Sequence, residues 1–535
     1  MHPDLLITGA HILTLDPTRP VASALAVRRG LIEFIGDDAA ALALRGPATQ
    51  HLNLAHAAAR VITPGFIDSH LHLMWYGKLL VRQADLVGSR DVEDIIHRLR
   101  QLQQRRGTSV ILQGHGFDQD KLTECRFPTR DELDKAFPTQ PVLITRVCGH
   151  AGVANSAMIA LTAASFPSIT SATANSDPTT GLYSEDCLTP LHRAIPRLTE
   201  VEMAEAILAA GRVALTTGIT SVHTLLDTPD QFRGYTLLDQ QNKLPLRVVA
   251  MPPYAAVESL HANGFRSGYG NDMLRLGSCK FFSDGSLGAR TALMTAPYSD
   301  DPAHPENLGT RIYDPKDLKS KCRDAQQKGF RIAIHAIGDG ALDESLAAIE
   351  HALDDPSNHH DNSFWRHRIE HASVTRPDQL ARMVRRKIVT TLQPQFVTSD
   401  TWTGHRLGPA RIPWAYPFNK MRQAGLPITI SSDCPVEKLN AFDALAAAVE
   451  GHPWRDGNPH DPSQQEPQTL SPQAALEAYC LGSAYAGCTE HRTGSLSLGK
   501  CADFVILSDN PLTTPNLRSL KAVEVFLGGR NVTPR

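Results

Sequence analysis

The residues with the clearest chemistry are His70 and His72, a His-x-His pair at the end of an apolar run. In a β-strand, residues i and i+2 point to the same face about 6.6–7 Å apart, so both imidazoles can reach one metal ion. A lone His-x-His is a weak signal, because two packed or exposed histidines are commoner than two ligands. The pair suggests a metal site without establishing one.

Three further apolar runs end in a residue type that binds metals. They end at His335, at His371 and beside Asp433. In barrels of alternating strands and helices, catalytic groups lie at the carboxyl ends of the strands. Imidazole and carboxylate suit divalent zinc, manganese, nickel or cobalt, and zinc is the default choice. The repeated placement favours a metal centre.

A lysine occupies another apolar run. Lys280 stands between Cys279 and Phe281. Burial of an ammonium group is costly, so the pKa of Lys280 should fall and a neutral amine should become available. The alternative is a lysine paired with Asp284 or another carboxylate, and the residues leave both interpretations open.

Short apolar runs with helical stretches between them recur through the middle of the chain, which is typical of parallel βα units. Eight such runs are what a TIM-type barrel requires. The expected fold class is therefore α/β, a (β/α)8 TIM-type barrel. The runs cover residues 61–67, 142–147, 219–225, 274–282, 331–337, 367–371, 388–392 and 428–432.

The two ends of the chain have a different texture, with short apolar runs separated by turn residues, which indicates hairpin strands. We expect residues 1–62 and 485–535 to form one small composite β-sandwich domain around a barrel at 63–484. The gap between the first two barrel runs is far longer than one crossover helix needs. It predicts an inserted lid or subdomain at 73–141.

The composition excludes several function classes. The 535 residues include 53 basic and 56 acidic side chains, a net charge of −3, so there is no basic footprint for nucleic acid. No run of about 18 apolar residues predicts a membrane span. The nine cysteines contain no Cys-x-x-Cys pair, which disfavours a disulfide framework, and a cytoplasmic location fits best. A small-molecule substrate is favoured.

Taken together, the motifs resemble the metal-dependent amidohydrolase superfamily. More narrowly they are similar to the branch that contains N-substituted formamide deformylases, often called amidohydrolase family 3. The resemblance covers nearly the whole chain, and it is far more specific for superfamily than for substrate. It is carried by residues 64–72, 280–288, 335–339, 368–372, 432–437 and 499–507.

The resemblance implies a binuclear metal centre at the mouth of the barrel. Lys280, carboxylated by carbon dioxide, would bridge the two ions as a carbamate. Two such metals polarise a carbonyl and make hydroxide available near neutral pH. Asp433 would accept the proton of the water and hand it to the leaving nitrogen. The implied ligands are His70, His72 and Asp433 for the first metal, and His335 and His371 for the second.

Four more residues are candidates for substrate contact. His150 and Asn155 match a family segment that is usually Asp-Gly-His, with Cys148 where that Asp is expected. His223 ends the third run, and Asp284 follows Lys280. For each, a structural role is the alternative: a bond to a nearby carbonyl, core packing or the orientation of a neighbour.

We therefore expect a hydrolase that cleaves the carbon–nitrogen bond of an amide-like substrate, such as an N-substituted formamide. A deaminase or a cyclic-amide hydrolase on the same scaffold is the alternative. Deamination is disfavoured, because no glutamate soon follows His335. An ester or phosphotriester hydrolase and a non-catalytic regulatory protein are less favoured alternatives. A homodimer is an expectation from the family alone.

Overall fold

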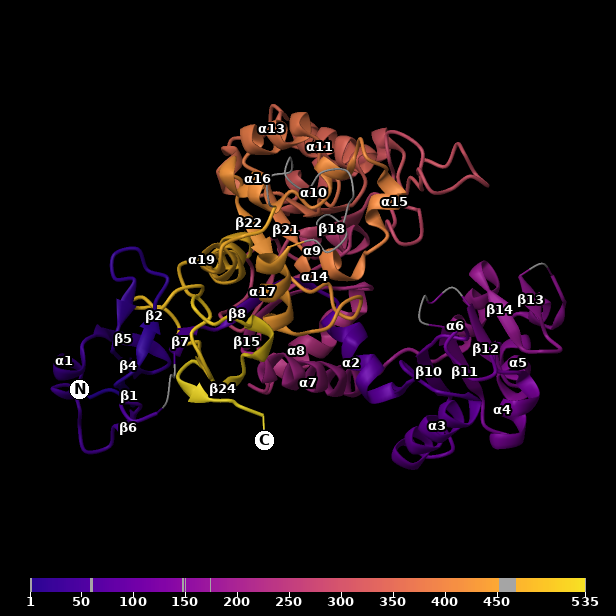
Figure 1. Cartoon of the computed structure of the whole chain (residues 1–535), viewed down its shortest axis with the longest axis horizontal. Coiled ribbons are helices and arrows are strands. Elements are labelled where there is room, and N and C mark those ends of the chain that lie inside the picture. The colour runs from indigo at the N-terminus through magenta and orange to yellow at the C-terminus, as the bar shows by residue number, and fades with distance from the viewer. Residues whose placement is uncertain are drawn as a thin grey trace. The chain divides into compact units, whose positions relative to one another are not determined.

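The computed structural model describes residues 2–57, 61–146, 149, 151–173, 175–451 and 468–534. It divides into two compact units (Figure 1). The larger unit is formed by Met1–Leu73 with Gly211–Arg535, and the smaller one by Met74–Ala210. Every helix among the described residues is too short or too polar to cross a membrane.

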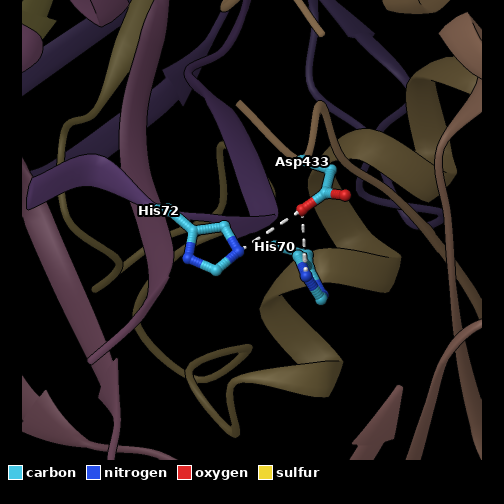
Figure 2. A group of neighbouring side chains, drawn as sticks. All are labelled: His70, His72 and Asp433. Atoms are coloured by element: carbon cyan, nitrogen blue, oxygen red, sulfur yellow. Dashed lines mark ion pairs between the residues drawn. The ribbon is translucent and has the colours of Figure 1, made fainter. Parts of the chain in front are cut away.

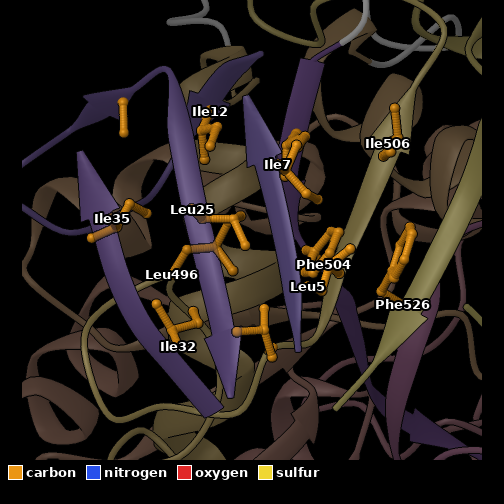
Figure 3. Close-up of a cluster of buried hydrophobic side chains, with 14 of the residues drawn as sticks. Leu5, Ile7, Ile12, Leu25, Ile32, Ile35, Leu496, Phe504, Ile506 and Phe526 are labelled. Atoms are coloured by element: carbon orange, nitrogen blue, oxygen red, sulfur yellow. The ribbon is translucent and has the colours of Figure 1, made fainter. Parts of the chain in front are cut away.

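Both ends of the chain contribute to the β-rich part of the larger unit. Strand β23 (Phe504–Leu507), from the C-terminal end, pairs antiparallel with β7 (Val61–Pro64), from the N-terminal end. Two sheets share a hydrophobic core that contains Leu25 and Phe504 (Figure 3). The first sheet has the order β5 (Leu31–Gly36), β4 (Ala24–Arg28), β1 (Leu5–Thr8), β6 (Gln50–Asn53); the second has the order β25 (Arg530–Asn531), β24 (Ala522–Leu527), β23, β7, β2 (His11–Leu13), β3 (Val21–Ala22).

Parallel strands form the two remaining sheets of the larger unit. Their side chains are almost continuously buried, as in parallel sheets covered on both faces. The first sheet has the order β17 (Leu274–Leu276), β16 (Arg247–Met251), β15 (Ile219–Leu225), β8 (Phe66–Leu71); the second has the order β18 (Cys279–Phe282), β19 (Ile332–Ala336), β20 (Arg368–His371), β21 (Val389–Leu392), β22 (Ile428–Ile430).

Hydrogen bonds link these two parallel sheets. The N–H of Lys280 in β18 donates to the carbonyl of Pro252, just after β16, at 2.8 Å. The N–H of Asp433, just after β22, donates to the carbonyl of His70 in β8 at 2.9 Å. With helices between the strands, this is an α/β arrangement of the TIM-barrel type. The predicted α/β class and its TIM-type architecture are confirmed.

Capping residues set the starts of helices that follow strands. The side chain of Asp314 accepts from the N–H of Lys316, with Pro315 at the first helical position of α10. The helices of the larger unit are α1 (Asp38–Leu42), α8 (Phe232–Gln240), α9 (Val257–Ala262), α10 (Pro315–Gln327), α11 (Asp339–Leu353), α12 (Asn362–Trp365), α13 (Pro377–Arg386), α14 (Pro394–Ser399), α15 (Thr403–Leu407), α16 (Phe418–Gln423), α17 (Ala441–Glu450), α19 (Pro472–Glu477) and α20 (Ser483–Ala486).

The smaller unit has its own sheet and core, and it extends well past residue 141. Its first three strands are parallel, and the others are antiparallel. The order is β13 (Ser176–Asp177), β14 (Leu182–Ser184), β12 (Ala151–Ala154), β11 (Val142–Arg146), β10 (Leu112–Phe117), β9 (Gln83–Asp85). The accompanying helices are α2 (Leu73–Arg82), α3 (Val92–Arg106), α4 (Arg130–Ala136), α5 (Ser156–Ala163), α6 (Thr189–Ala194) and α7 (Glu200–Thr216), of which α2 and α7 include residues assigned to both units.

The predicted second barrel strand, 142–147, is wrong. Its described part is β11, which lies in the sheet of the smaller unit. The place between β15 and β17 is taken by β16 (Arg247–Met251), an apolar run that is not among the eight predicted strands. Local periodicity identifies a strand but not the sheet that it joins, and this is the physical reason for the error.

Two predicted single strands are divided in the structure. The run 61–67 breaks at Gly65, whose N–H donates to the carbonyl of Asp503, so that β7 belongs to the terminal sheet and β8 to a parallel sheet. The run 274–282 breaks at Gly277, whose N–H donates to the carbonyl of Ala250. Its halves, β17 and β18, lie in different sheets.

Candidate metal centre

His70 and His72 meet Asp433 where β8 and β22 end (Figure 2). One potential ligand atom from each residue lies within 4.8 Å of the others. The Oδ1 atom of Asp433 is 3.2 Å from Nε2 of His70 and 3.8 Å from Nε2 of His72. Burial raises the pKa of Asp433, but the two histidines and Lys280 outweigh it and keep this pKa below its usual value. The carboxylate is therefore charged at neutral pH.

Left-handed backbone conformations aim two of the candidate ligands. His371 has φ +74° and Asp433 has φ +57°. In β20, residues 369 and 371 would point away from the face that carries Glu370, but the chain leaves regular strand geometry at His371. Such conformations cost about 1–3 kcal/mol each and persist where the surroundings enforce them, commonly at functional sites.

The imidazole of His371 lies among other candidate ligands. Its ring centroid is 4.4 Å from that of His335 and 5.0 Å from that of His70. Burial, and the nearby positive charge that His335, His70 and Lys280 can carry, hold the pKa of His371 well below its usual value. The ring is thus neutral and retains a lone pair for a metal.

Lys280 is buried in β18, with 4% of its surface exposed. Its Nζ has no hydrogen-bond partner within the described ranges. Burial lowers the pKa of Lys280 to about 8, although Glu370 and Asp433 act in the opposite direction. A minor neutral fraction therefore exists near neutral pH. The predicted alternative, an ion pair with Asp284, is not found among the described residues.

The donor set fits a divalent metal. Both ring nitrogens of His371 and Nζ of Lys280 are buried without a hydrogen-bond partner in the part of the chain that the structure describes. Buried polar atoms are rarely left unsatisfied, so such a cluster needs an explanation. Neutral imidazoles beside a charged carboxylate are ligands that zinc and similar ions accept, and a metal would satisfy them.

Each of three candidate histidines has one ring nitrogen held by another group. Nδ1 of His70 donates to Glu370, and Nδ1 of His72 donates to Asp227 at 2.9 Å. Nε2 of His335 donates to the carbonyl of Gly285 at 2.9 Å. A neutral imidazole has a single N–H, so these partners leave Nε2 of His70 and His72 and Nδ1 of His335 as lone-pair donors.

Sequence reasoning missed the partners of these histidines. Glu370 was visible as a charged residue inside a buried run, which is a signal that it is paired. Asp227 follows β15 by two residues, and nothing in the sequence around it indicates a paired carboxylate. Neither residue could be matched to its histidine, because the contacts join strands far apart in the sequence.

Asn155, one of the residues predicted to bind substrate, has a structural role instead. The side chain of Asn155 is fully buried, accepts from the N–H groups of Met158 and Val142, and donates to the carbonyls of Phe137 and Gln140. It caps α5 and has no bonding capacity left for a ligand. His150 lies outside the described residues.

The carboxylate of Asp284 is likewise occupied. It accepts from the backbone N–H groups of Leu293, Ile337 and Gly338 and lies 3.4 Å from Nε2 of His335. This side chain is buried and fixes the loop after β19 beside His335. It therefore orients a candidate ligand rather than contacting a substrate.

His223 lies in the interior of the larger unit, fully buried. Its Nδ1 accepts from the guanidinium of Arg368 at 3.0 Å. Burial and the charge of Arg368 hold the pKa of His223 well below its usual value. His223 is thus a neutral member of an internal polar network, and the structure does not support the predicted substrate contact.

A family model described as "Amidohydrolase family" matches residues 57–533 of the chain. The YtcJ protein of Bacillus subtilis (strain 168), which is named as an amidohydrolase, is 31% identical over 98% of both sequences. The N-substituted formamide deformylase of Arthrobacter pascens is 23% identical over 98% of this chain and 97% of its own length.

A solved structure is similar over almost the whole chain. An uncharacterized metal-dependent hydrolase from Pyrococcus furiosus has a TM-score of 0.80 and 29% sequence identity, and the match covers 95% of this chain and 100% of that one. The likeness therefore spans the terminal sheets as well as the strands that carry the candidate metal ligands.

Proposed function

Because the chain belongs to the amidohydrolase family of metal-dependent hydrolases acting on carbon–nitrogen bonds, we propose that it hydrolyses an N-substituted formamide or a related amide. The observation that carries the proposal is the convergence of His70, His72 and Asp433 beside His335, His371 and buried Lys280. The 23% identical deformylase of Arthrobacter pascens supports the substrate class.

The proposed centre holds two divalent ions, with zinc as the default. Lys280 would be a further ligand once it is a carbamate, which forms when its neutral amine attacks carbon dioxide and releases a proton. The carbamate supplies anionic oxygens that an amine lacks. When bound, the ions polarise the amide carbonyl and make hydroxide available near neutral pH. The proposed ligands are His70, His72 and Asp433 for one ion and His335 and His371 for the other.

Asp433 is the proposed proton carrier. Its charged carboxylate accepts a proton from the attacking water, and it then donates that proton to the nitrogen as the carbon–nitrogen bond breaks. The products are a carboxylic acid, formate for a formamide, and an amine. The neighbouring His70, His72 and Lys280 hold the pKa of Asp433 below its usual value, and this keeps the carboxylate ionised before the reaction.

An aromatic ring at the site supports an apolar substituent on the substrate. Phe282 follows Lys280 by two residues and so shares its face of β18. Its ring centroid lies 4.6 Å from Nζ of Lys280 and 5.5 Å from the ring of His335, and 39% of its surface is exposed. A large exposed apolar side chain next to the ligands is a surface that an alkyl or aryl group can cover.

The finer fold assignment is also a proposal. We infer that the two parallel sheets form a (β/α)8 barrel, with β17 outside its eight strands, and that the terminal sheets form a composite β-sandwich. The hydrogen bonds of Lys280 with Pro252 and of Asp433 with His70 support this, because they connect the sheets at both edges.

The first test is metal content per chain, measured by mass spectrometry on protein purified without chelator. About two zinc-like ions are expected. The same protein is then given N-substituted formamides, longer-chain amides, cyclic amides, aminated heterocycles and aryl esters, with formate, amine and ammonia measured separately. Release of ammonia from a heterocycle with one ion per chain would favour a deaminase. Turnover of esters alone would contradict the amide assignment.

A further inference from the structure

A buried ion pair lies next to His70. Arg368 and Glu370 are two residues apart in β20 and share one face of the strand. Arg368 is 1% exposed and Glu370 0%. The guanidinium donates from Nε to Oε1 at 2.8 Å and from Nη2 to Oε2 at 2.9 Å. Packed apolar side chains would avoid the desolvation cost of such a pair, so stability alone does not account for it.

Glu370 binds the side of His70 that faces away from Asp433. The Nδ1 atom of His70 donates to Oε2 of Glu370, while its Nε2 faces Oδ1 of Asp433 at 3.2 Å. A proton fixed on Nδ1 leaves the lone pair on Nε2. The carboxylate therefore decides which nitrogen of His70 is offered at the candidate metal site.

Arg368 fixes this carboxylate against three other strands. Its Nη2 also donates to the carbonyl of Ser69 at 2.7 Å and to Oγ1 of Thr391 at 2.9 Å, and its Nη1 donates to Nδ1 of His223 at 3.0 Å. Ser69 directly precedes His70 in β8. The guanidinium thus holds both the backbone beside His70 and the carboxylate that orients its ring.

We propose that Arg368 and Glu370 are positioning residues for the metal that His70, His72 and Asp433 bind. Glu370 sets the orientation and the protonated nitrogen of His70, and Arg368 acts through Glu370. A carboxylate bonded to a ligating imidazole also raises the basicity of the ligand, and loss of such a partner typically weakens metal affinity about 10- to 100-fold. The inference rests on the proposed metal centre but on no particular substrate.

The test measures the affinity of metal-free protein for Zn²⁺ by competition with a chromophoric chelator. Glu370→Gln keeps the shape and an oxygen acceptor but removes the charge. It is expected to weaken Zn²⁺ binding about 10- to 100-fold and to shift the visible absorption of the Co²⁺-substituted protein, which reports the ligand geometry. Wild-type affinity together with an unchanged Co²⁺ spectrum would overturn the proposal.

A double-mutant cycle tests the order of action. Arg368→Met should weaken Zn²⁺ binding in the wild-type background, and it should have a smaller effect in the Glu370→Gln background, because only its bond to the carbonyl of Ser69 then acts on His70. Fully additive losses would overturn that part. The double variant removes both charges and leaves no buried unpaired ion, so it keeps the comparison available if a single variant does not fold.

The buried pair of Arg247 and Asp503 is the matched control. It is also bidentate, at 2.5 and 2.9 Å, and its residues are 9% and 5% exposed. Asp503→Asn should lower stability but leave Zn²⁺ affinity and the Co²⁺ spectrum of the folded protein unchanged. A wild-type protein that binds Zn²⁺ but cleaves no amide would contradict the proposed function and leave this inference intact.

Discussion

Asp433 is joined to His70 through both its backbone and its side chain. Its N–H donates to the carbonyl of His70 at 2.9 Å, and its Oδ1 lies 3.2 Å from Nε2 of the same residue. The backbone bond does not depend on the identity of the side chain at 433. A substitution there can therefore change the chemistry of the site while the strand ends stay in place.

Asp433→Asn should retain most of the metal and lose most of the turnover. Asparagine tolerates the left-handed conformation at 433 and keeps one oxygen ligand, but it cannot accept the proton of the water. Loss of general acid–base catalysis typically costs roughly 10²–10⁴-fold in kcat. Metal content and steady-state kinetics check this, with Asp443→Asn on α17 as control. Undiminished turnover would exclude Asp433 as proton carrier.

Lys280→Ala should lower metal content and activity together, because the variant has no amine to form a carbamate. Short carboxylic acids, which can place a carboxylate in the vacated space, should partly restore both. They should not restore Asp433→Asn, whose defect lies in proton transfer. If metal content and rate both stay at wild-type values in Lys280→Ala, the bridging carbamate is wrong.

Phe282→Ala should reduce kcat/KM about tenfold for amides with a large apolar nitrogen substituent, which corresponds to about 1.4 kcal/mol of lost contact. N-methyl substrates should be much less affected, since they reach less of the ring. Metal content serves as the control, because Phe282 offers no ligand. An equal loss for both substrate sizes would show that the ring supports the site without contacting the substituent.

His367 should make the protein sensitive to acid. It is buried, its Nδ1 accepts from the N–H of Ile332, and its Nε2 donates to Gln326. Burial, with a smaller contribution from Arg331, lowers its pKa to about 3. Between about pH 6.5 and pH 3, His367 is protonated in the unfolded chain but not in the folded chain. The free energy of unfolding therefore has its full value above about pH 6.5 and falls as the pH decreases towards 3.

The measurement compares wild type with His367→Gln in urea unfolding at pH 7 and pH 5. Wild type should lose about 2 kcal/mol more than the variant between the two pH values, because only wild type carries this linkage. Glutamine retains a hydrogen-bonding group at the position. The same pH dependence in both proteins would show that other groups cause the loss of stability.

Strand ends and their polar residues could be predicted because they depend on local pattern. The His-x-His spacing and the apolar runs before His335 and His371 follow from strand periodicity, and the structure places those side chains together. The sheet joined by 142–147 and the breaks at Gly65 and Gly277 could not be read, because they are decided by long-range pairing.

The orientation of the candidate ligand side chains could not be predicted from the sequence either. His371 and Asp433 both have positive φ, which sets the direction of each side chain, and neither residue type by itself predicts such a conformation. The partners of the histidines come from distant parts of the sequence: Glu370 from β20, and Asp227 from the segment after β15. Tertiary packing fixes both features, and no local preference encodes them.

Strand β7, which leads through Gly65 into the strand that carries His70, pairs with β23 from the last part of the chain. A ribosome makes β7 long before it makes β23. Residues Val61–Pro64 therefore remain without this partner until Phe504–Leu507 have been made. A nascent chain that stops short of Phe504 would leave this edge of β7 open to pairing with a neighbouring chain.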